Sequence, residues 1–370
     1  MIRNKGIKGT TPFGIYIHWP YCISKCPYCD FYSQVRKDIN QENIIDDYIK
    51  ELNFYHQLTS TETVSSIFFG GGTPSLISPL LIEKIINHII KTWHTQKNIE
   101  ISLEANPNTD KKNLFKDLKR AGINRLSLGV QALNEQDLRF LGRTHSLTDA
   151  LKSIDTVLQT FENHSMDLIY ARPEQKLSTW EKELEQAANF GFKHLSLYQL
   201  TIEEGTTFAK KQIQTLDEQT ARQLFNFTNN YLKKQNYKHY EVSNYAQPQY
   251  ESKHNLLYWQ GDNYIGIGPS AHGRIKTQTH IYATTYRCNL EELTPEERAE
   301  ELLITGLRLK QGITYDNFEK KCGIKLEQVI NPTQKQELER LKFIRSTSNK
   351  IYLTRKGLPV MNTILQELIR

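Results

Sequence analysis

The sequence predicts an α/β fold, an incomplete (β/α)6 barrel that is open at one side, followed by a smaller, mainly helical and winged-helix-like domain. Two observations predict this fold. Strand-like and helix-like segments alternate six times between residue 13 and about residue 240, and short helical segments of different composition follow. Six units are fewer than the eight of a closed barrel, so the sheet is expected to stay open, with a doubly wound sheet as the alternative.

The first strand is expected over 13–19, where apolar residues alternate with Gly14, Tyr16 and His18. A helix follows whose apolar face gathers Ile44, Ile45, Tyr48, Ile49 and Leu52. Further strands are expected at 64–69, 99–104, 125–130, 166–170 and 194–200, and further helices at 79–91, 110–121, 134–141, 147–160, 178–191 and 217–235.

Local signals define the ends of two of these helices. Asp110 is an N-cap candidate, and Gly122 fits the C′ position at the other end of the same helix. Ser178 and Glu181 have the spacing of a capping box, which would begin the helix that stops at Gly191.

Three regions are predicted along the chain: a barrel domain at 1–242, an irregular connecting segment at 243–290, and a C-terminal domain at 291–370. The connecting segment is rich in Tyr, Asn, Gly and His and shows little periodicity. The last region is expected to hold a helix from Thr294 to Leu309, two shorter helices, a hairpin of Phe343–Arg345 with Ile351–Leu353, and a final helix.

The composition indicates a soluble protein of the cytoplasm. The 47 basic and 41 acidic residues give a dispersed net charge of +6, which is typical of a solvated surface, so no nucleic acid is expected as a partner. No run approaches the ~18 apolar residues of a membrane span, and no apolar segment follows the basic N-terminus as in an export signal. Of five cysteines, Cys288 and Cys322 are isolated, and no disulfide framework is expected.

The other three cysteines are Cys22, Cys26 and Cys29, directly after the first predicted strand. An odd number of thiols this close cannot all form disulfides with one another, and the spacing suits one compact metal centre. An iron–sulfur cubane normally takes four cysteines, so a missing fourth leaves one iron open to a non-protein ligand.

Further unusual residues follow the other strands, where the loops of a parallel sheet converge. Gly70–Pro74 follows the second strand, and three consecutive glycines let a backbone approach a ligand closely with its amides free. Glu104 ends the third strand and could hold an amine or a ribose hydroxyl. Gln131, Arg143 and Asp167 follow or lie in later strands, and each taken singly also fits ordinary surface polarity; a buried aspartate would need a partner.

The cysteine loop and the Gly-Gly-Thr-Pro loop together resemble the radical S-adenosylmethionine (SAM) superfamily. The resemblance implies that Cys22, Cys26 and Cys29 hold a [4Fe–4S] cluster and that SAM binds the fourth iron through its amino and carboxylate groups. An electron from the cluster then cleaves SAM to a 5′-deoxyadenosyl radical, and the expected fold is the radical SAM partial barrel.

The resemblance extends over nearly the whole chain to the anaerobic coproporphyrinogen III oxidase-like group. The segments that carry it are Tyr16–Pro20, Leu126–Gln131, Leu141–Arg143, Asp167–Tyr170 and His239–Tyr245. It implies that SAM is contacted by Tyr16, Gly71, Gly72, Thr73, Glu104, Gln131, Arg143 and Asp167.

Two features resemble the heme chaperone HemW subfamily of that group. Cys29-Asp30-Phe31 stands where the true dehydrogenases carry Cys-x-Cys, and only 21 residues precede Cys22. The motif His-Asn-x-x-Tyr-Trp is present with His254, Tyr258 and Trp259, in which a neutral imidazole can bind heme iron and the two aromatic rings can flank a macrocycle.

The resemblance implies a chaperone that transfers heme to membrane respiratory hemoproteins, acting in the cytoplasm or peripherally at the inner membrane, with a homodimer as one possible state. The alternative is an oxygen-independent coproporphyrinogen III dehydrogenase, a radical SAM oxidative decarboxylase. A third reading is a cluster-binding protein without SAM chemistry. It is supported by one departure, Tyr170-Ala171-Arg172-Pro173, where the family usually reads Tyr-Gly-Leu-Pro. The added Cβ and charge near the cofactor site are expected to make the loop adapt or to weaken SAM binding.

Overall fold

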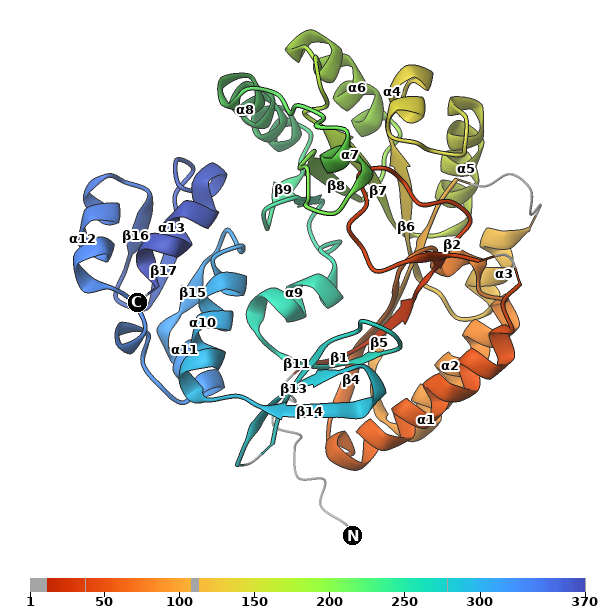
Figure 1. Cartoon of the computed structure of the whole chain (residues 1–370), viewed down its shortest axis with the longest axis horizontal. Coiled ribbons are helices and arrows are strands. Elements are labelled where there is room, and N and C mark those ends of the chain that lie inside the picture. Colours follow the sequence, from red (N-terminus) through yellow and green to blue (C-terminus); the bar gives the residue numbers. More distant parts are fainter. Residues whose placement is uncertain (1–11, 37, 108–112, 278, 370) are drawn as a thin grey trace.

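The computed structural model describes residues 12–36, 38–107, 113–277 and 279–369. Its centre is an open parallel sheet in which six strands follow one another in chain order (Figure 1). These are β1 (Pro12–Trp19), β4 (Thr63–Gly71), β5 (His94–Ala105), β6 (Arg125–Gln131), β7 (Asn163–Tyr170) and β8 (His194–Gln199). The predicted incomplete barrel with an open sheet is confirmed.

Helices cover the outer face of this sheet, as alternating β–α units require. They are α1 (Gln41–Thr59), α2 (Pro79–Thr92), α3 (Leu114–Arg120), α4 (Glu135–Phe140), α5 (Leu147–Thr160), α6 (Leu177–Asn189) and α8 (Glu218–Lys234). The short α7 (Thr207–Lys210) lies instead against the cysteine loop, where the Phe208 amide donates to the Pro27 carbonyl at 2.9 Å. The pattern that predicted β1 and α1 reflects burial, because Phe13, Ile15, Ile45 and Leu52 are each 0% exposed.

The helix-end predictions have different outcomes. Gly122 has a φ of +106°, as expected for the residue after a helix, whereas Asp110 lies outside the described residues. The predicted capping box is wrong: α6 begins at Leu177 with Lys176 as its N-cap, without a side-chain cap. Ser178 therefore already lies in the first helical turn, where its hydroxyl is not placed to accept the amide of the third helical residue.

The expected irregular character of 243–290 is also wrong, because this segment contains a helix and several strands. They are β10 (Asn244–Ala246), α9 (Lys253–Gln260), β11 (Asn263–Ile267), β12 (Gly273–Lys276), β13 (Ile281–Thr285) and β14 (Asn289–Glu292), and β9 (Lys238–His239) precedes them. β11 lies parallel to β1 on the side away from β4, and β12, β13 and β14 continue the sheet in antiparallel order. Strands of three to five residues are too short to show a period.

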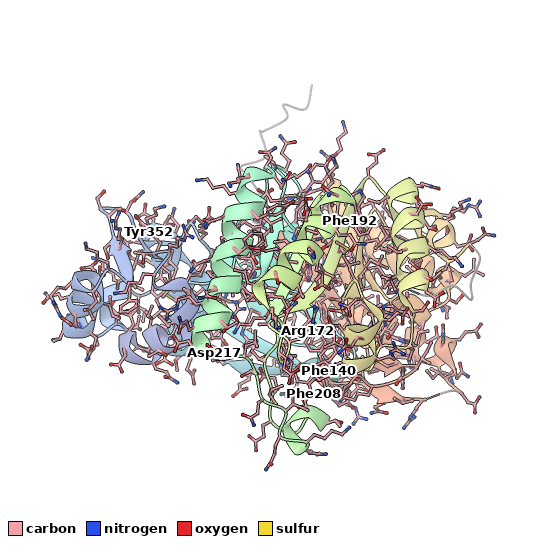
Figure 2. The ribbon with its side chains drawn as sticks, turned by 90° about the horizontal axis from the view of Figure 1, so that it is seen from above. Phe140, Arg172, Phe192, Phe208, Asp217 and Tyr352 are labelled. Carbon is pink, nitrogen blue, oxygen red and sulfur yellow. The ribbon has the colours of Figure 1, made fainter. Side chains whose placement is uncertain are left out.

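The C-terminal part combines helices with a three-stranded antiparallel sheet, in agreement with the predicted winged-helix-like domain. Its elements are α10 (Pro295–Gly306), β15 (Ile313–Thr314), α11 (Tyr315–Cys322), α12 (Pro332–Arg340), β16 (Ile344–Ser346), β17 (Lys350–Leu353) and α13 (Met361–Leu368). This part has its own buried apolar cluster, which includes Leu303 and Ile351. Figure 2 shows it with Tyr352 beside the barrel that holds Phe192; the exact domain boundaries stay a prediction.

Two short strands, β2 (Tyr21–Cys22) and β3 (Gln34–Val35), pair in parallel and lie at the two ends of the cysteine loop. In the part of the chain that the structure describes, no helix has both the length and the apolar character that a bilayer crossing requires.

Candidate functional site

A cavity of about 290 Å³ lies at the C-terminal ends of the parallel strands. It is lined by all three cysteines of the motif and by seven of the eight residues predicted to contact SAM: Gly71, Gly72, Thr73, Glu104, Gln131, Arg143 and Asp167. The eighth residue, Tyr16, is not among the described residues that line this cavity. Its hydroxyl is 3.0 Å from Nδ1 of His18. Residues from six loops or strand ends thus meet at one place.

The cysteine loop is shaped by its own backbone and by its neighbours. The Cys29 amide donates to the Cys26 carbonyl at 3.1 Å, which turns the chain between these two thiols. Cys22 is buried, whereas Cys26 and Cys29 are half-buried at the cavity wall. Within the described residues, no three His, Cys, Asp or Glu side chains could hold a single metal ion. A cubane requires a different arrangement, because each of its thiolates binds a separate iron.

The glycine loop after β4 is fastened to the cysteine loop by main-chain hydrogen bonds. The Gly72 amide donates to the Trp19 carbonyl at 2.6 Å, and the Thr73 amide donates to the Tyr21 carbonyl at 2.9 Å. A Cβ on Gly72 would lie 2.7 Å from the Tyr21 oxygen and 3.0 Å from the Cys22 sulfur, which leaves room for hydrogen only. The prediction that the glycine amides are free is therefore wrong for Gly72, and the Gly71 amide also donates, to Glu104 Oε2 at 3.3 Å.

Arg143 connects the cysteine loop to the strand ends. Its Nη1 lies 3.4 Å from the Cys26 sulfur and 3.3 Å from the Tyr28 hydroxyl, and its Nη2 donates to the Gly129 carbonyl at 3.2 Å and to the Asn106 side chain. The positive charge of Arg143 therefore lies directly beside one of the three sulfurs.

Two carboxyl groups lie on the cavity wall opposite the cysteines. Glu104 Oε2 accepts the Gly71 amide at 3.3 Å, and burial together with the nearby Asp167 raises the pKa of Glu104 to about 8. Asp167 accepts the Ser127 hydroxyl at 3.0 Å, so this buried aspartate has the partner that the sequence required, although burial raises its pKa as well. A ligand amine that entered here would favour the ionised carboxylates.

Gln131 reaches the cavity because β6 is irregular at its end. The register between β6 and β7 shifts between Gly129 and Gln131, and Gln131 has a φ of +72°. A Cβ on Gly129 would lie 2.9 Å from Nε2 of Gln131, so the missing side chain makes room for the amide.

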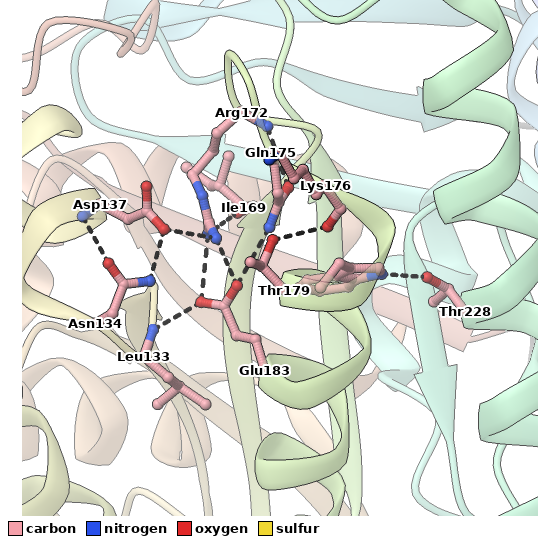
Figure 3. Close-up of polar contacts among 11 residues, drawn as sticks. Leu133, Asn134, Asp137, Ile169, Arg172, Gln175, Lys176, Thr179, Glu183 and Thr228 are labelled. Carbon is pink, nitrogen blue, oxygen red and sulfur yellow. Dashed lines mark hydrogen bonds and ion pairs between the residues drawn. The ribbon is translucent and has the colours of Figure 1, made fainter.

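The Ala171–Arg172 departure is accommodated without contact with the cavity, and Figure 3 shows the polar contacts of Arg172. Among the described residues that line the cavity, neither Ala171 nor Arg172 occurs. Arg172 is 2% exposed, and its Nη2 lies 2.5 Å from Glu183 Oε2 and 2.9 Å from Asp137 Oδ2. Its Nη1 donates to the Ile169 carbonyl at 2.7 Å. The added charge is thus paired with two carboxylates and does not point at the cofactor site, which is the loop adaptation that the sequence left open.

The Arg172 cluster also holds neighbouring strand ends together. Glu183 Oε1 accepts the Leu133 amide at 2.8 Å, so this carboxylate bridges α6 to the loop after β6. That loop begins directly after Gln131, and both Gln131 and Ile169, whose carbonyl accepts from Arg172, line the cavity. The polar contacts of the Arg172 cluster, drawn in Figure 3, therefore connect residues next to the cavity wall.

The residues predicted to bind heme lie on α9, away from the cysteine cavity. His254 is 0% exposed, with Nδ1 2.8 Å from the Ser66 hydroxyl on β4 and Nε2 hydrogen-bonded to the Tyr258 hydroxyl. The Phe68 ring stacks on the imidazole with centroids 5.1 Å apart. Burial lowers the pKa of His254 to about 3, so the ring is neutral.

Trp259, at the end of α9, faces a different environment. The Arg308 guanidinium lies 4.6 Å from the centroid of its ring, and Trp259 lines a second, larger cavity. Its indole nitrogen has no hydrogen-bond partner among the described residues. The structure therefore separates the three predicted heme residues: His254 and Tyr258 bond each other in the interior, and Trp259 lines a cavity.

Sequence reasoning missed other residues of the cysteine cavity. Tyr28, Asn106, Ser127 and Tyr198 also line it. Asn106 and Ser127 carried a usable signal, because polar residues at or near the ends of buried strands either bind a ligand or need partners.

A model of the radical SAM superfamily matches residues 16–187, and a model of the HemN C-terminal domain matches residues 293–360. Coproporphyrinogen III oxidase (HemN) from Escherichia coli, a radical SAM enzyme, has a similar structure, with a TM-score of 0.77 at 18% identity over 96% of this chain and 90% of that one. The chain belongs to the radical SAM superfamily, and the likeness to HemN concerns the fold.

Relatives with higher sequence identity show which family within the superfamily this chain resembles. The heme chaperone HemW of Buchnera aphidicola subsp. Acyrthosiphon pisum is 34% identical over 96% of this chain and 98% of that protein. HemW of Lactococcus lactis subsp. lactis is 33% identical over 97% of each. The mitochondrial radical S-adenosyl methionine domain-containing protein 1 of Danio rerio is 32% identical over 96% of this chain and 86% of that protein. Within the superfamily, the chain belongs to the HemW family.

Radical SAM membership implies a [4Fe–4S] cluster and SAM, and the residues present fit both. Three thiols share one cavity wall, a guanidinium lies beside one of them, and Gly72 leaves room directly next to another. When bound, the cluster would supply the electron that cleaves SAM. The chain itself supplies the thiolates, the positive charge of Arg143 and the carboxyl groups that face a ligand amine.

Proposed function

We propose that this protein is a heme chaperone, which binds heme and transfers it to membrane respiratory hemoproteins from the cytoplasmic side. The observation that carries the proposal is the extent of its likeness to the HemW chaperones, which spans 96% of this chain and 98% of one of them. We further propose that the protein can form a homodimer, and that binding of the cluster and SAM controls its formation.

The proposed cofactor residues follow from the cavity. Cys22, Cys26 and Cys29 ligate the cluster, and SAM is held by Tyr16, Gly71, Gly72, Thr73, Glu104, Gln131, Arg143 and Asp167. All but Tyr16 line the same 290 Å³ cavity, which supports these assignments. Phe31, where the dehydrogenases have a further cysteine, also lines it and is 58% exposed. This apolar, exposed side chain supports heme handling over porphyrinogen oxidation.

His254 is the proposed heme ligand, with Tyr258 and Trp259 as flanking rings. The neutral imidazole is the form that binds iron. Since Nε2 is bonded to the Tyr258 hydroxyl and the ring is buried, ligation requires that this hydrogen bond break and that α9 move. The broken hydrogen bond alone costs about 1 kcal/mol, and the movement of α9 adds the loss of the contacts to Ser66 and Phe68.

Anaerobic heme titration of cluster-loaded protein tests the proposal, with absorption spectra as the readout. Wild-type protein is expected to take up heme and to pass it to an apo-hemoprotein, and His254→Ala is expected to lose the iron–imidazole spectrum. Absence of heme uptake by cluster-loaded wild-type protein would refute the proposal.

His194→Ala is the matched control, because His194 is equally buried in a similar setting. Its Nδ1 is 2.7 Å from the Ser165 hydroxyl and its Nε2 is 2.8 Å from the Tyr240 hydroxyl. Equal loss of heme in both variants would indicate damage to the fold and would remove His254 from the proposal. Formation of protoporphyrinogen from coproporphyrinogen III, SAM and reductant would favour the dehydrogenase instead.

A further inference from the structure

The second cavity, which we name the interdomain groove, has a volume of about 1040 Å³. It lies between β11, β12 and the end of α9 on one side and α10, α11 and β15 on the other. Pro12 and Glu62, at or just before the N-terminal ends of β1 and β4, also line it. The groove therefore lies near the N-terminal ends of the parallel strands, whereas the cysteine cavity lies at their C-terminal ends. Among the described residues that line the groove, none is a predicted cluster or SAM residue.

One part of the groove lining is apolar. It includes Trp259 and the largely buried side chains of Ile275, Leu302, Leu309, Ile313 and Phe318, which come from both sides of the groove. An aromatic ring with aliphatic neighbours suits a flat, apolar ligand.

The polar part of the lining is basic, with six cationic side chains against two carboxylates, Glu62 and Asp262. The cations are Arg274, Lys276, Arg298, Lys320, Lys321 and Lys350. Since like charges gathered round one cavity raise its positive potential, the groove favours an anionic ligand.

Local pairing leaves part of this charge available. Arg274 and Arg298 share the single carboxylate of Glu301, with contacts of 2.5 and 2.9 Å. The side chains of Lys276 and Lys350 donate to backbone carbonyls, at 2.5 Å to Lys320 and 3.2 Å to Gln311 respectively. A carbonyl does not neutralise an ammonium group, so these two lysines could pair with ligand carboxylates.

We propose that the interdomain groove binds heme in a non-covalent docking mode, with the macrocycle on the apolar lining and the two propionates on Lys276 and Lys350. This inference rests on the proposed chaperone function. A groove of about 1040 Å³ is at the upper end of the roughly 300–1,000 Å³ of ligand sites and accommodates a large planar molecule.

The groove site is distinct from ligation by His254. His254 and Trp259 are five residues apart on α9, so their side chains are roughly 140° apart around the helix axis and about 7.5 Å apart along it. A macrocycle on Trp259 therefore does not reach the buried imidazole while α9 keeps its present hydrogen bonds. Docking in the groove does not depend on iron, whereas transfer to His254 does.

Three probes separate these contributions: hemin, iron-free protoporphyrin IX and protoporphyrin IX dimethyl ester, each titrated against full-length, cluster-loaded protein. Wild-type protein is expected to bind hemin and iron-free protoporphyrin IX, and to bind the uncharged ester about tenfold or more weakly. The double variant Lys276→Glu/Lys350→Glu is expected to lose about tenfold or more in affinity for both acids, with a smaller change for the ester.

The matched control is Lys152→Glu/Lys182→Glu, which changes the net charge equally at exposed positions on α5 and α6. It is expected to bind all three probes like the wild type. His254→Ala is expected to change the hemin spectrum and to keep its affinity for iron-free protoporphyrin IX.

Equal binding of both acids by wild-type protein and the groove variant overturns the groove site and leaves the chaperone proposal in place. Loss of protoporphyrin IX binding in His254→Ala, with the groove variant unaffected, also overturns it. If wild-type protein binds none of the probes, the chaperone proposal and the groove site both fail.

Discussion

Replacing Arg172 by methionine is predicted to destabilise the protein by about 3–5 kcal/mol. Methionine keeps the aliphatic part of the side chain and removes the guanidinium, together with its hydrogen bond to the Ile169 carbonyl. It leaves Glu183, which is only 7% exposed, without the guanidinium that lies 2.5 Å away. Asp137 is 29% exposed at its side chain and is better solvated, so most of the cost comes from Glu183.

A double-mutant cycle with Glu183→Gln measures how much of that cost is the unpaired charge. Glutamine keeps an oxygen for the Leu133 amide, and Arg172 keeps Asp137, so this single variant is expected to lose only about 1–2 kcal/mol. In Arg172→Met/Glu183→Gln no buried charge is left at position 183. The double variant is therefore expected to be at least 2 kcal/mol more stable than the sum of the two single changes predicts.

The assay is chemical denaturation of the apo-protein, followed by far-ultraviolet circular dichroism at neutral pH. Single-variant costs that add within about 0.5 kcal/mol in the double variant would refute the reasoning, since independent sites behave in that way. A loss below 1 kcal/mol for Arg172→Met would also refute it.

Three further predictions concern the cysteine loop and α9. Gly72→Ala is expected to lower the iron and sulfide content of reconstituted protein, because its Cβ would lie 3.0 Å from the Cys22 sulfur. Gly191→Ala, where a φ of +83° costs stability but no atom lies within 4 Å of the added Cβ, is expected to keep that content and so controls for general destabilisation. Ser66→Ala is expected to cost about 1–3 kcal/mol in denaturation, since His254 Nδ1 loses its buried partner. The unfolded chain protonates His254 near pH 6.5 and the folded one near pH 3, so stability relative to His254→Gln should fall by about 3 kcal/mol from pH 6.5 to 4, as measured by urea denaturation at each pH.

The cysteine cavity could be predicted from the sequence because its signals are local. Cys22, Cys26 and Cys29 are within eight residues, and the glycine loop follows the next strand of the barrel directly. In parallel β–α units, the loops that follow neighbouring strands all lie at the C-terminal ends of those strands. Loops that follow consecutive strands in the sequence are therefore close together in the fold.

Other features depend on contacts between distant residues, which a single sequence does not display. Arg172 looked like a charge near the cofactor, and its neutralisation depends on Asp137 and Glu183 from other elements. His254 was predicted as a heme ligand, and its burial and its bond to Ser66, 188 residues earlier, could not be seen in the motif. β11 was missed because five residues that include Tyr264 and a glycine carry no clear strand pattern.

The bonds from Gly72 and Thr73 to the carbonyls of Trp19 and Tyr21 have a consequence for the life of the cluster. They are made by the polypeptide alone, so they hold the start of the cysteine loop beside β4 without a cluster. We therefore expect the loop to keep this position after oxidative loss of iron and sulfide, so that the same molecule could accept a new cluster.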